Sequence, residues 1–161
     1  STPLYSSAAS DVYKRQGIKA SLRAGVRTID HGSMLDEEGA RLLKAKGAYF
    51  APTLYVGHSI LHDNQALNIP AHQVEREKAM QGTQEKAFRI ALAHRLPIAF
   101  ATDAGVFPHG DNAREFKVRV DLGQAPMAAI EGATRIAAKF SGVIEDPVAR
   151  PTQCTVPSGH S

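Results

Sequence analysis

The chain has 161 residues, of which 43% are hydrophobic and 22% charged, and its formal net charge is +3 at pH 7. This is the composition of an ordinary globular protein that is long enough to bury one hydrophobic core. The basic residues are scattered, which argues against nucleic-acid binding. No apolar stretch approaches the roughly 20 residues that span a membrane. A single cysteine, Cys154, excludes an internal disulfide and a cysteine-built zinc site.

The two ends of the chain read differently from its middle. Residues 1–16 show no helical or strand periodicity, and their last six letters, DVYKRQ, match the in-frame translation of a transposase sequencing adapter. A genuine flexible arm is the alternative. Residues 147–161 contain three prolines and no apolar period, which indicates either a spurious end or a natural disordered tail. We therefore expect the folded part to lie within residues 17–146.

The first half of this middle segment alternates between helix and strand. A helix is predicted to end at about residue 24, where Gly25 caps it, and a short strand follows over residues 26–30. A second helix is predicted over residues 34–46, with Asp36 as its N-cap and a glycine at its end. Residues 48–54 then form the second predicted strand.

The second half continues the alternation after a looser stretch over residues 55–70. Its predicted elements are a long helix over 71–95, a strand over 97–102, a loop over 105–111, and helices over 112–121 and 126–140. Strands separated by helices indicate a parallel sheet with right-handed connections. Because three strands cannot close an eight-stranded barrel, the pattern predicts an open α/β domain or a slice of a larger barrel, and the lack of any earlier strand favours the slice.

Two residues stand where predicted strands end. His31 follows the apolar strand in the string TIDHG, and Asp103 follows another in the string FATDAG. Imidazole is a ligand for zinc and similar ions, and a carboxylate at such a place can bind a metal and accept a proton from water. The alternatives are a hydrogen-bonded structural histidine and an aspartate that caps a helix or pairs with an arginine such as Arg114.

Other polar residues are weaker candidates. Tyr55 follows the second predicted strand and His109 lies in the loop after Asp103, so both are candidates for substrate contact, with packing and solvent exposure as the alternatives. His58 and His62 are four residues apart and would share a helix face if that segment were helical. No glycine-rich phosphate loop or serine elbow is present, which leaves chemistry at a barrel rim.

Four strings together resemble a known family: AGVRTIDHG, APTLY, FATDAGVFPHGDNAREF and PMAAIEGATRIAAKFSG. They look like the carboxyl-terminal half of the metal-dependent amidohydrolase superfamily, and most resemble its imidazolonepropionase-like branch, which includes Xaa-Pro dipeptidases. The resemblance covers about residues 17–146. It implies part of a (β/α)8 barrel, about strands six to eight, with one or two divalent ions, usually zinc, at the rim.

The resemblance also implies roles for individual residues. His31 would be the metal ligand ending strand six, and Asp103 the ligand and general base ending strand eight. The family's other ligands, from strands one, four and five, have no counterpart here. The implied function is hydrolysis of amide or peptide C–N bonds, most often of dipeptides, by a protein that binds a small substrate and no nucleic acid or membrane.

Three further expectations follow. The isolated chain is expected to be inactive, because it supplies two ligands of a larger set. Its inward sheet face, formed by Ile29, Phe50 and Phe100, would lack partner strands, which predicts marginal stability and association through the exposed edge. A homo-oligomer of the parent protein is also expected. The alternatives are a deaminase or cyclic-imide hydrolase of the same superfamily, or a small non-catalytic α/β module.

Overall fold

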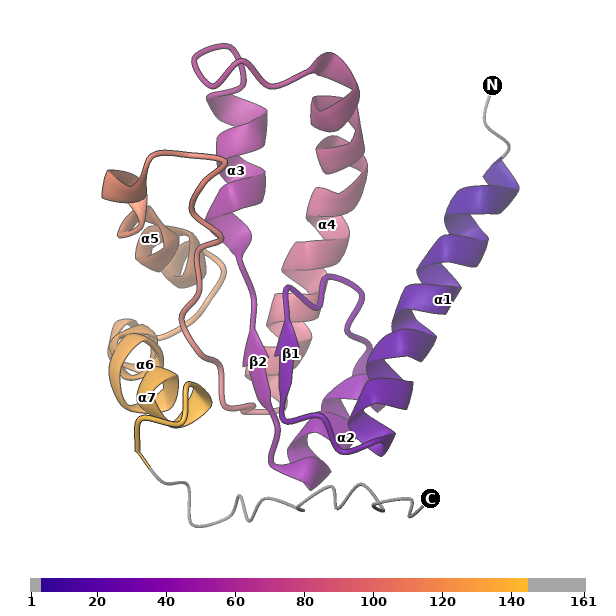
Figure 1. Cartoon of the computed structure of the whole chain (residues 1–161), viewed down its shortest axis with the longest axis vertical. Coiled ribbons are helices and arrows are strands. Elements are labelled where there is room, and N and C mark those ends of the chain that lie inside the picture. Colours follow the sequence, from indigo (N-terminus) through magenta and orange to yellow (C-terminus); the bar gives the residue numbers. More distant parts are fainter. Residues whose placement is uncertain (1–3, 145–161) are drawn as a thin grey trace, which may run out of the picture.

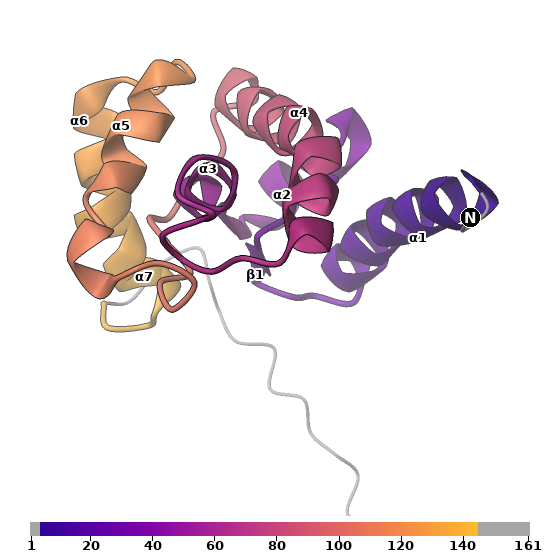
Figure 2. The ribbon, with the colours of Figure 1, turned by 90° about the horizontal axis from the view of Figure 1, so that it is seen from above.

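The structure is a computed structural model that describes residues 4–144, with side chains described from Lys14 onward. It is dominated by helices arranged around a small parallel sheet (Figure 1). Viewed from above, helices α5 to α7 lie on one side, α3 and α4 in the middle, and α1 on the other side (Figure 2). Residues 1–3 of the segment 1–16, and the tail over residues 147–161 with Cys154, lie outside the described residues.

The sheet has two strands among the described residues, β1 (Thr28–Asp30) and β2 (Tyr49–Ala51), and they are parallel, as predicted. Ile29 pairs with Phe50 in this register. The third predicted strand, over residues 97–102, is reduced to a single parallel bridge between Ile98 and Phe50. The reason is that the next backbone groups have helical partners: the N–H of Phe100 donates to Gly132 O at 3.0 Å, and Ala99 O accepts from the side chain of Arg119.

The N-terminal helices confirm the predicted caps, and the first begins earlier in the chain than expected. Helix α1 (Leu4–Arg23) begins within residues 1–16, outside the expected folded part over residues 17–146; its hydrophobic face is weak, so the sequence shows no helical periodicity there. An adapter origin of residues 1–16 stays a prediction. Helix α2 (Glu37–Lys46) begins at Asp36, whose side chain accepts from the Gly39 N–H at 2.8 Å. Lys19 of α1 forms salt bridges to Asp36 at 2.8 Å and Glu38 at 2.7 Å, which join the two helices.

A helical hairpin rises beyond the end of β2 (Figure 1). Its long arm is α4 (Ala71–Ala93), close to the prediction. Its short arm is α3 (Leu54–His62), which replaces the predicted looser stretch at its start. No local cap begins this helix, because the side chain of Thr53 makes no capping hydrogen bond. The first amides of α3 donate instead to Glu115, which is distant in the sequence. The two helices pack against each other, and α3 also packs on α5.

The C-terminal part of the described chain is helical. A 3-10 turn (His109–Asp111) leads into α5 (Arg114–Asp121). The predicted helix over residues 126–140 is present as α6 (Pro126–Glu131), a π-helical turn (Gly132–Ile136) and α7 (Ala137–Phe140), with Pro126 in the first turn. The turn brings the backbone of Gly132 against the extended segment: its carbonyl accepts from Phe100, and a Cβ there would lie 2.8 Å from Ile98 O.

The hydrophobic core lies between the sheet, α2 and α4. It is formed by Leu22, Ile29, Leu35, Ala40, Leu43, Ala48, Phe50, Leu54, Ala87, Phe88, Ala91, Leu96 and Ile98. Ile29 is 8% and Phe50 1% exposed, so the expectation that these residues form an uncovered sheet face is wrong: helices cover them. Phe100 is half-buried and packs on Phe116, with ring centroids 4.2 Å apart. No helix within residues 4–144 is long and apolar enough to cross a membrane.

Candidate active site at the strand ends

His31 stands immediately after β1, where the chain leaves the sheet. Its N–H donates to Ala51 O at 3.0 Å, which extends the parallel ladder by one bond, and its φ of 60° then turns the chain away. Left-handed backbone is uncommon for a residue with a Cβ and marks a position that its surroundings hold in place. The side chain is exposed, and its Nδ1 lies 2.9 Å from Thr53 Oγ1.

Asp103 leaves the third extended segment in the same way. Its φ is 54°, and its side chain is exposed. Its carboxylate has no hydrogen-bond or ion-pair partner among residues 14–144. The alternative of a pair with Arg114 is not observed, because Arg114 binds Tyr55 and Asp111 instead. The exposed carboxylate is open to a ligand, and left-handed backbone is uncommon for a residue with a Cβ.

Both residues lie at one edge of the parallel layer. β1, β2 and the segment at Ile98 run in the same direction, and His31 and Asp103 each follow the carboxyl end of one of them. In parallel α/β structures this is the edge at which ligands bind. His31 and Asp103 thus each follow an extended segment at this edge, with β2 between the two segments. That they serve one common site stays a prediction.

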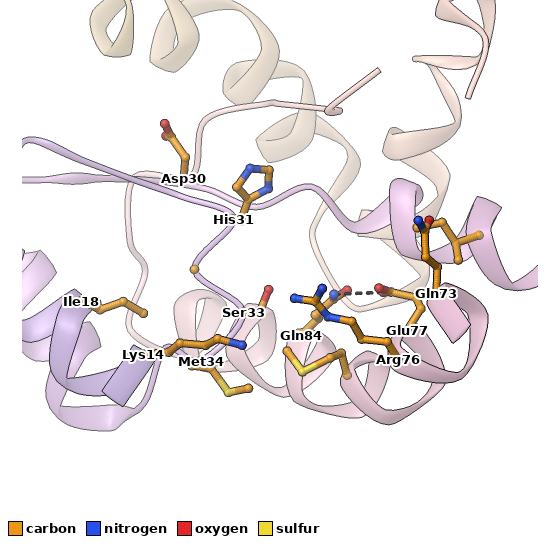
Figure 3. A pocket seen from close by; sticks show the side chains of 13 residues that line it. Lys14, Ile18, Asp30, His31, Ser33, Met34, Gln73, Arg76, Glu77 and Gln84 are labelled. Atoms are coloured by element: carbon orange, nitrogen blue, oxygen red, sulfur yellow. Dashed lines mark hydrogen bonds between the residues drawn. The ribbon is translucent and has the colours of Figure 1, made fainter. Parts of the chain in front are cut away.

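A cleft of about 490 Å³ opens beside His31. Figure 3 shows its walls: Lys14 and Ile18 come from α1, the β1 exit contributes Asp30 to Met34, and α4 contributes Gln73, Arg76, Glu77 and Gln84. Its α4 wall is ordered by a hydrogen bond from Gln84 Nε2 to Glu77 Oε1 at 3.0 Å. Asp103 is not among the residues that line this cleft.

Arg114 links Tyr55 to the turn that contains His109. Tyr55 is 2% exposed; its hydroxyl accepts from Arg114 Nη1 at 3.1 Å, and its ring meets Phe107 edge-on at 4.7 Å between centroids. Arg114 also pairs with Asp111 at 3.2 Å, which ties it to the turn that begins at the exposed His109. These are the contacts of a packed rim, the alternative that the sequence left open for Tyr55. A substrate role for both residues stays a prediction.

His58 and His62 share one face of α3, as the sequence predicts for a helical segment. Their ring centroids are 4.2 Å apart, and His58 also stacks on Tyr55 at 6.1 Å. Burial, followed by the charge of His62, lowers the pKa of His58 below its ordinary value. The neutral imidazole is therefore the stable form of His58 near neutral pH.

Sequence reasoning missed the ion pair between Glu115 and Arg119 on α5. Both side chains are 0% exposed, and Arg119 Nε donates to Glu115 Oε1 at 2.6 Å. Burial raises the pKa of Glu115, although Arg119 and two backbone amides favour its ionised form. Four-residue spacing of opposite charges on a helix usually indicates a solvated surface pair, so the sequence carries no signal for this burial.

Comparison with known proteins identifies the family. No protein-family model matches the chain. The ochratoxinase of Aspergillus niger is 31% identical over 124 residues, which are 76% of this chain and 25% of the ochratoxinase. A solved Xaa-Pro dipeptidase with methionine bound in its active site is 32% identical, with a TM-score of 0.70 over 80% of this chain and 32% of that one. A solved amidohydrolase is 27% identical, with a TM-score of 0.69 over 78% of this chain and 30% of that one.

The chain belongs to the amidohydrolase superfamily. The resemblance drawn from the four sequence strings is thereby confirmed. This amidohydrolase chain spans about a quarter of the length of the curated relatives that it matches. Its helix-dominated α/β fold is the corresponding part of those larger structures.

The amidohydrolase resemblance implies a divalent metal, which side-chain atoms of this chain would help to bind. Nε2 of His31 and the Asp103 carboxylate are donors that zinc accepts, and neither has a hydrogen-bond partner within the described part of the chain. No group of three or more His, Cys, Asp or Glu side chains among the described residues is placed to hold an ion. The two residues fit as contributors to a metal site and do not complete one by themselves.

Proposed function

We propose that the protein containing this chain hydrolyses C–N bonds of amides or peptides at a divalent metal centre to which His31 and Asp103 contribute. One observation carries the proposal. Both residues follow the same edge of a parallel layer in left-handed backbone conformation, and each has a side-chain atom that can bind a metal and has no hydrogen-bond partner among the described residues. The similarity to an amidohydrolase, an ochratoxinase and a Xaa-Pro dipeptidase supports it.

The proposed chemistry assigns separate tasks to the two residues. A bound divalent ion supplies Lewis acidity, which lowers the pKa of a water molecule and polarises an amide carbonyl. His31 offers Nε2 as a ligand, because its Nδ1 is engaged by Thr53. The Asp103 carboxylate accepts a proton from the water whose oxygen attacks the carbonyl carbon. When the C–N bond breaks, Asp103 returns that proton to the leaving nitrogen.

Within this class, a dipeptidase or carboxypeptidase is the proposed activity, and zinc is the proposed metal. The support is the similarity to a Xaa-Pro dipeptidase over 80% of this chain. We further propose that this chain forms about strands six to eight of a (β/α)8 barrel and that the remaining ligands come from other strands. The isolated chain should then be inactive.

The test uses the full-length parent protein and two readouts, metal content and hydrolysis of dipeptides, an ochratoxin and cyclic amides. His31→Ala and Asp103→Asn should each lower hydrolysis by at least ~100-fold, and His31→Ala should also lower the metal content. His72→Ala and Asp121→Asn are matched controls on exposed helix surfaces. Full activity of both site variants would contradict the proposal, and hydrolysis of cyclic amides alone would replace the dipeptidase assignment.

A further inference from the structure

Helix α3 begins without a side-chain cap from its own N-terminal residue. Thr53 occupies the N-cap position, yet its side chain makes no capping hydrogen bond. The first two amides of the helix, those of Leu54 and Tyr55, donate instead to Glu115 Oε2 at 3.0 and 2.7 Å. A carboxylate about sixty positions away thus performs the task that a threonine hydroxyl usually performs at a helix start.

This exchange leaves the Thr53 hydroxyl for another partner. An N-cap side chain ordinarily accepts from the second or third amide of the helix, and the second amide, that of Tyr55, is already bound to Glu115. A buried charged acceptor at a helix N-terminus is favoured over a neutral hydroxyl both by bond strength and by the helix dipole. The Thr53 hydroxyl lies 2.9 Å from His31 Nδ1.

The same ion pair holds the backbone on both sides of Thr53. Arg119 Nη2 donates to Pro52 O at 2.8 Å, immediately before Thr53, and Glu115 binds the two amides immediately after it. Because both charged side chains are fully buried and bound to each other, neither can swing away at low cost. Arg119 also donates to Ala99 O at 3.1 Å, so it binds the backbone of the segment that leads to Asp103.

We propose that the Glu115–Arg119 ion pair is a positioning device for the His31 ring, acting through Thr53. The pair fixes the start of α3 and the backbone of Thr53, and Thr53 in turn holds Nδ1 of His31. The ring is thereby oriented with Nε2 as the nitrogen open to a ligand. This orientation of the ring does not depend on the proposed function, but its importance for catalysis rests on the function proposed above.

The test observes the His31 ring directly, by ¹⁵N and ¹H NMR of the metal-free chain with labelled histidine. Thr53→Val removes the hydroxyl at nearly constant shape and should shift both ring nitrogen resonances of His31, whereas Thr53→Ser should restore them. Thr134→Val is the matched control, because the Thr134 hydroxyl binds Ile130 O within its own helix. Unchanged His31 resonances in Thr53→Val would overturn the proposal.

A second variant tests the long-range step. Glu115→Gln keeps the shape of the side chain but removes its charge, and it should shift the His31 ring resonances in the same direction as Thr53→Val although Thr53 is intact. If this variant does not fold, amide exchange in the unmodified chain decides the step: the amides of Leu54 and Tyr55 should exchange at least ~100-fold more slowly than in an unstructured peptide. Unprotected amides, or a folded Glu115→Gln with unchanged His31 resonances, would overturn the proposal.

These spectra need neither metal nor substrate, so the two proposals fail separately. An unaltered ring in the variants refutes the positioning device and leaves the hydrolase proposal standing. Absence of hydrolysis by the full-length protein refutes the hydrolase and leaves the ring measurements unaffected.

Discussion

The ring of Phe50 lies directly against the backbone of Gly32, and a Cβ at Gly32 would overlap that ring. Gly32 also has a φ of 53° and follows His31, whose φ is 60°. Two successive left-handed residues turn the chain off β1 while the central core residue Phe50 fills the space beneath the turn. The position of His31 at the sheet edge therefore depends on the absence of a side chain at the next residue.

Replacing Gly32 by alanine should destabilise the chain strongly. The substitution combines left-handed strain with a steric clash in the core, and we expect a loss of about 2–4 kcal/mol in the free energy of unfolding. Gly82→Ala in the middle of α4 is the control: its Cβ would meet nothing within 4 Å, and the change should add about 0.5–1 kcal/mol. Urea unfolding followed by circular dichroism measures both; equal stability of the two variants would contradict the analysis.

The cap of α2 can be separated from its salt bridge by two substitutions at one position. Asp36→Ala removes both the bond from the Gly39 amide and the bridge to Lys19, and should cost about 1 kcal/mol or more. Asp36→Asn retains a capping oxygen and removes the charge, so it should cost less. The comparison uses the midpoints of urea unfolding. Identical midpoints for the two variants would show that the cap contributes nothing.

The buried pair on α5 should be far more sensitive than an exposed pair on the same helix. Glu115→Ala leaves the guanidinium of Arg119 buried without its partner, and we expect a loss of about 3–5 kcal/mol. The double variant Glu115→Leu/Arg119→Met should lose less, because no charge stays buried. Lys117→Ala breaks the exposed pair with Asp121 at the same spacing and should change stability by less than about 0.5 kcal/mol. Similar losses in Glu115→Ala and Lys117→Ala would refute the distinction.

Acid should destabilise the chain in part through His58. Burial and then His62 lower the pKa of His58 from 6.5, with Lys117 adding to the effect and Asp63 and Asp121 opposing it. The unfolded chain therefore binds this proton more tightly, so the contribution of His58 to stability is present above pH 6.5 and is lost as the pH falls through the lowered pKa. His58→Gln should reduce the loss of stability between pH 7.5 and 5.5, and His72→Gln should not. A pH profile unchanged by His58→Gln would contradict this.

Local sequence signals predicted much of the fold because the forces involved act over a few residues. Asp36 and Gly47 begin and end α2 through bonds to groups within four residues of them, and the structure has both. The exits of the extended segments at His31 and Asp103 were predicted from an apolar run followed by glycine or by Ala-Gly. The long helix α4 and the first-turn proline of α6 follow from the same kind of local preference.

The misjudged elements depend on groups that are distant in the sequence. Helix α3 has no local cap and is begun by Glu115, and the third strand ends early because Gly132 and Arg119 take its backbone groups. Burial of Glu115 and Arg119 cannot be read from their spacing, since the same spacing at Lys117 and Asp121 is exposed. Sequence alone thus determined which residues stand at the strand ends, because helix caps and strand periodicity are local. Only the tertiary structure decided how the His31 ring is held, because its support runs through buried charges that the fold brings together from α5.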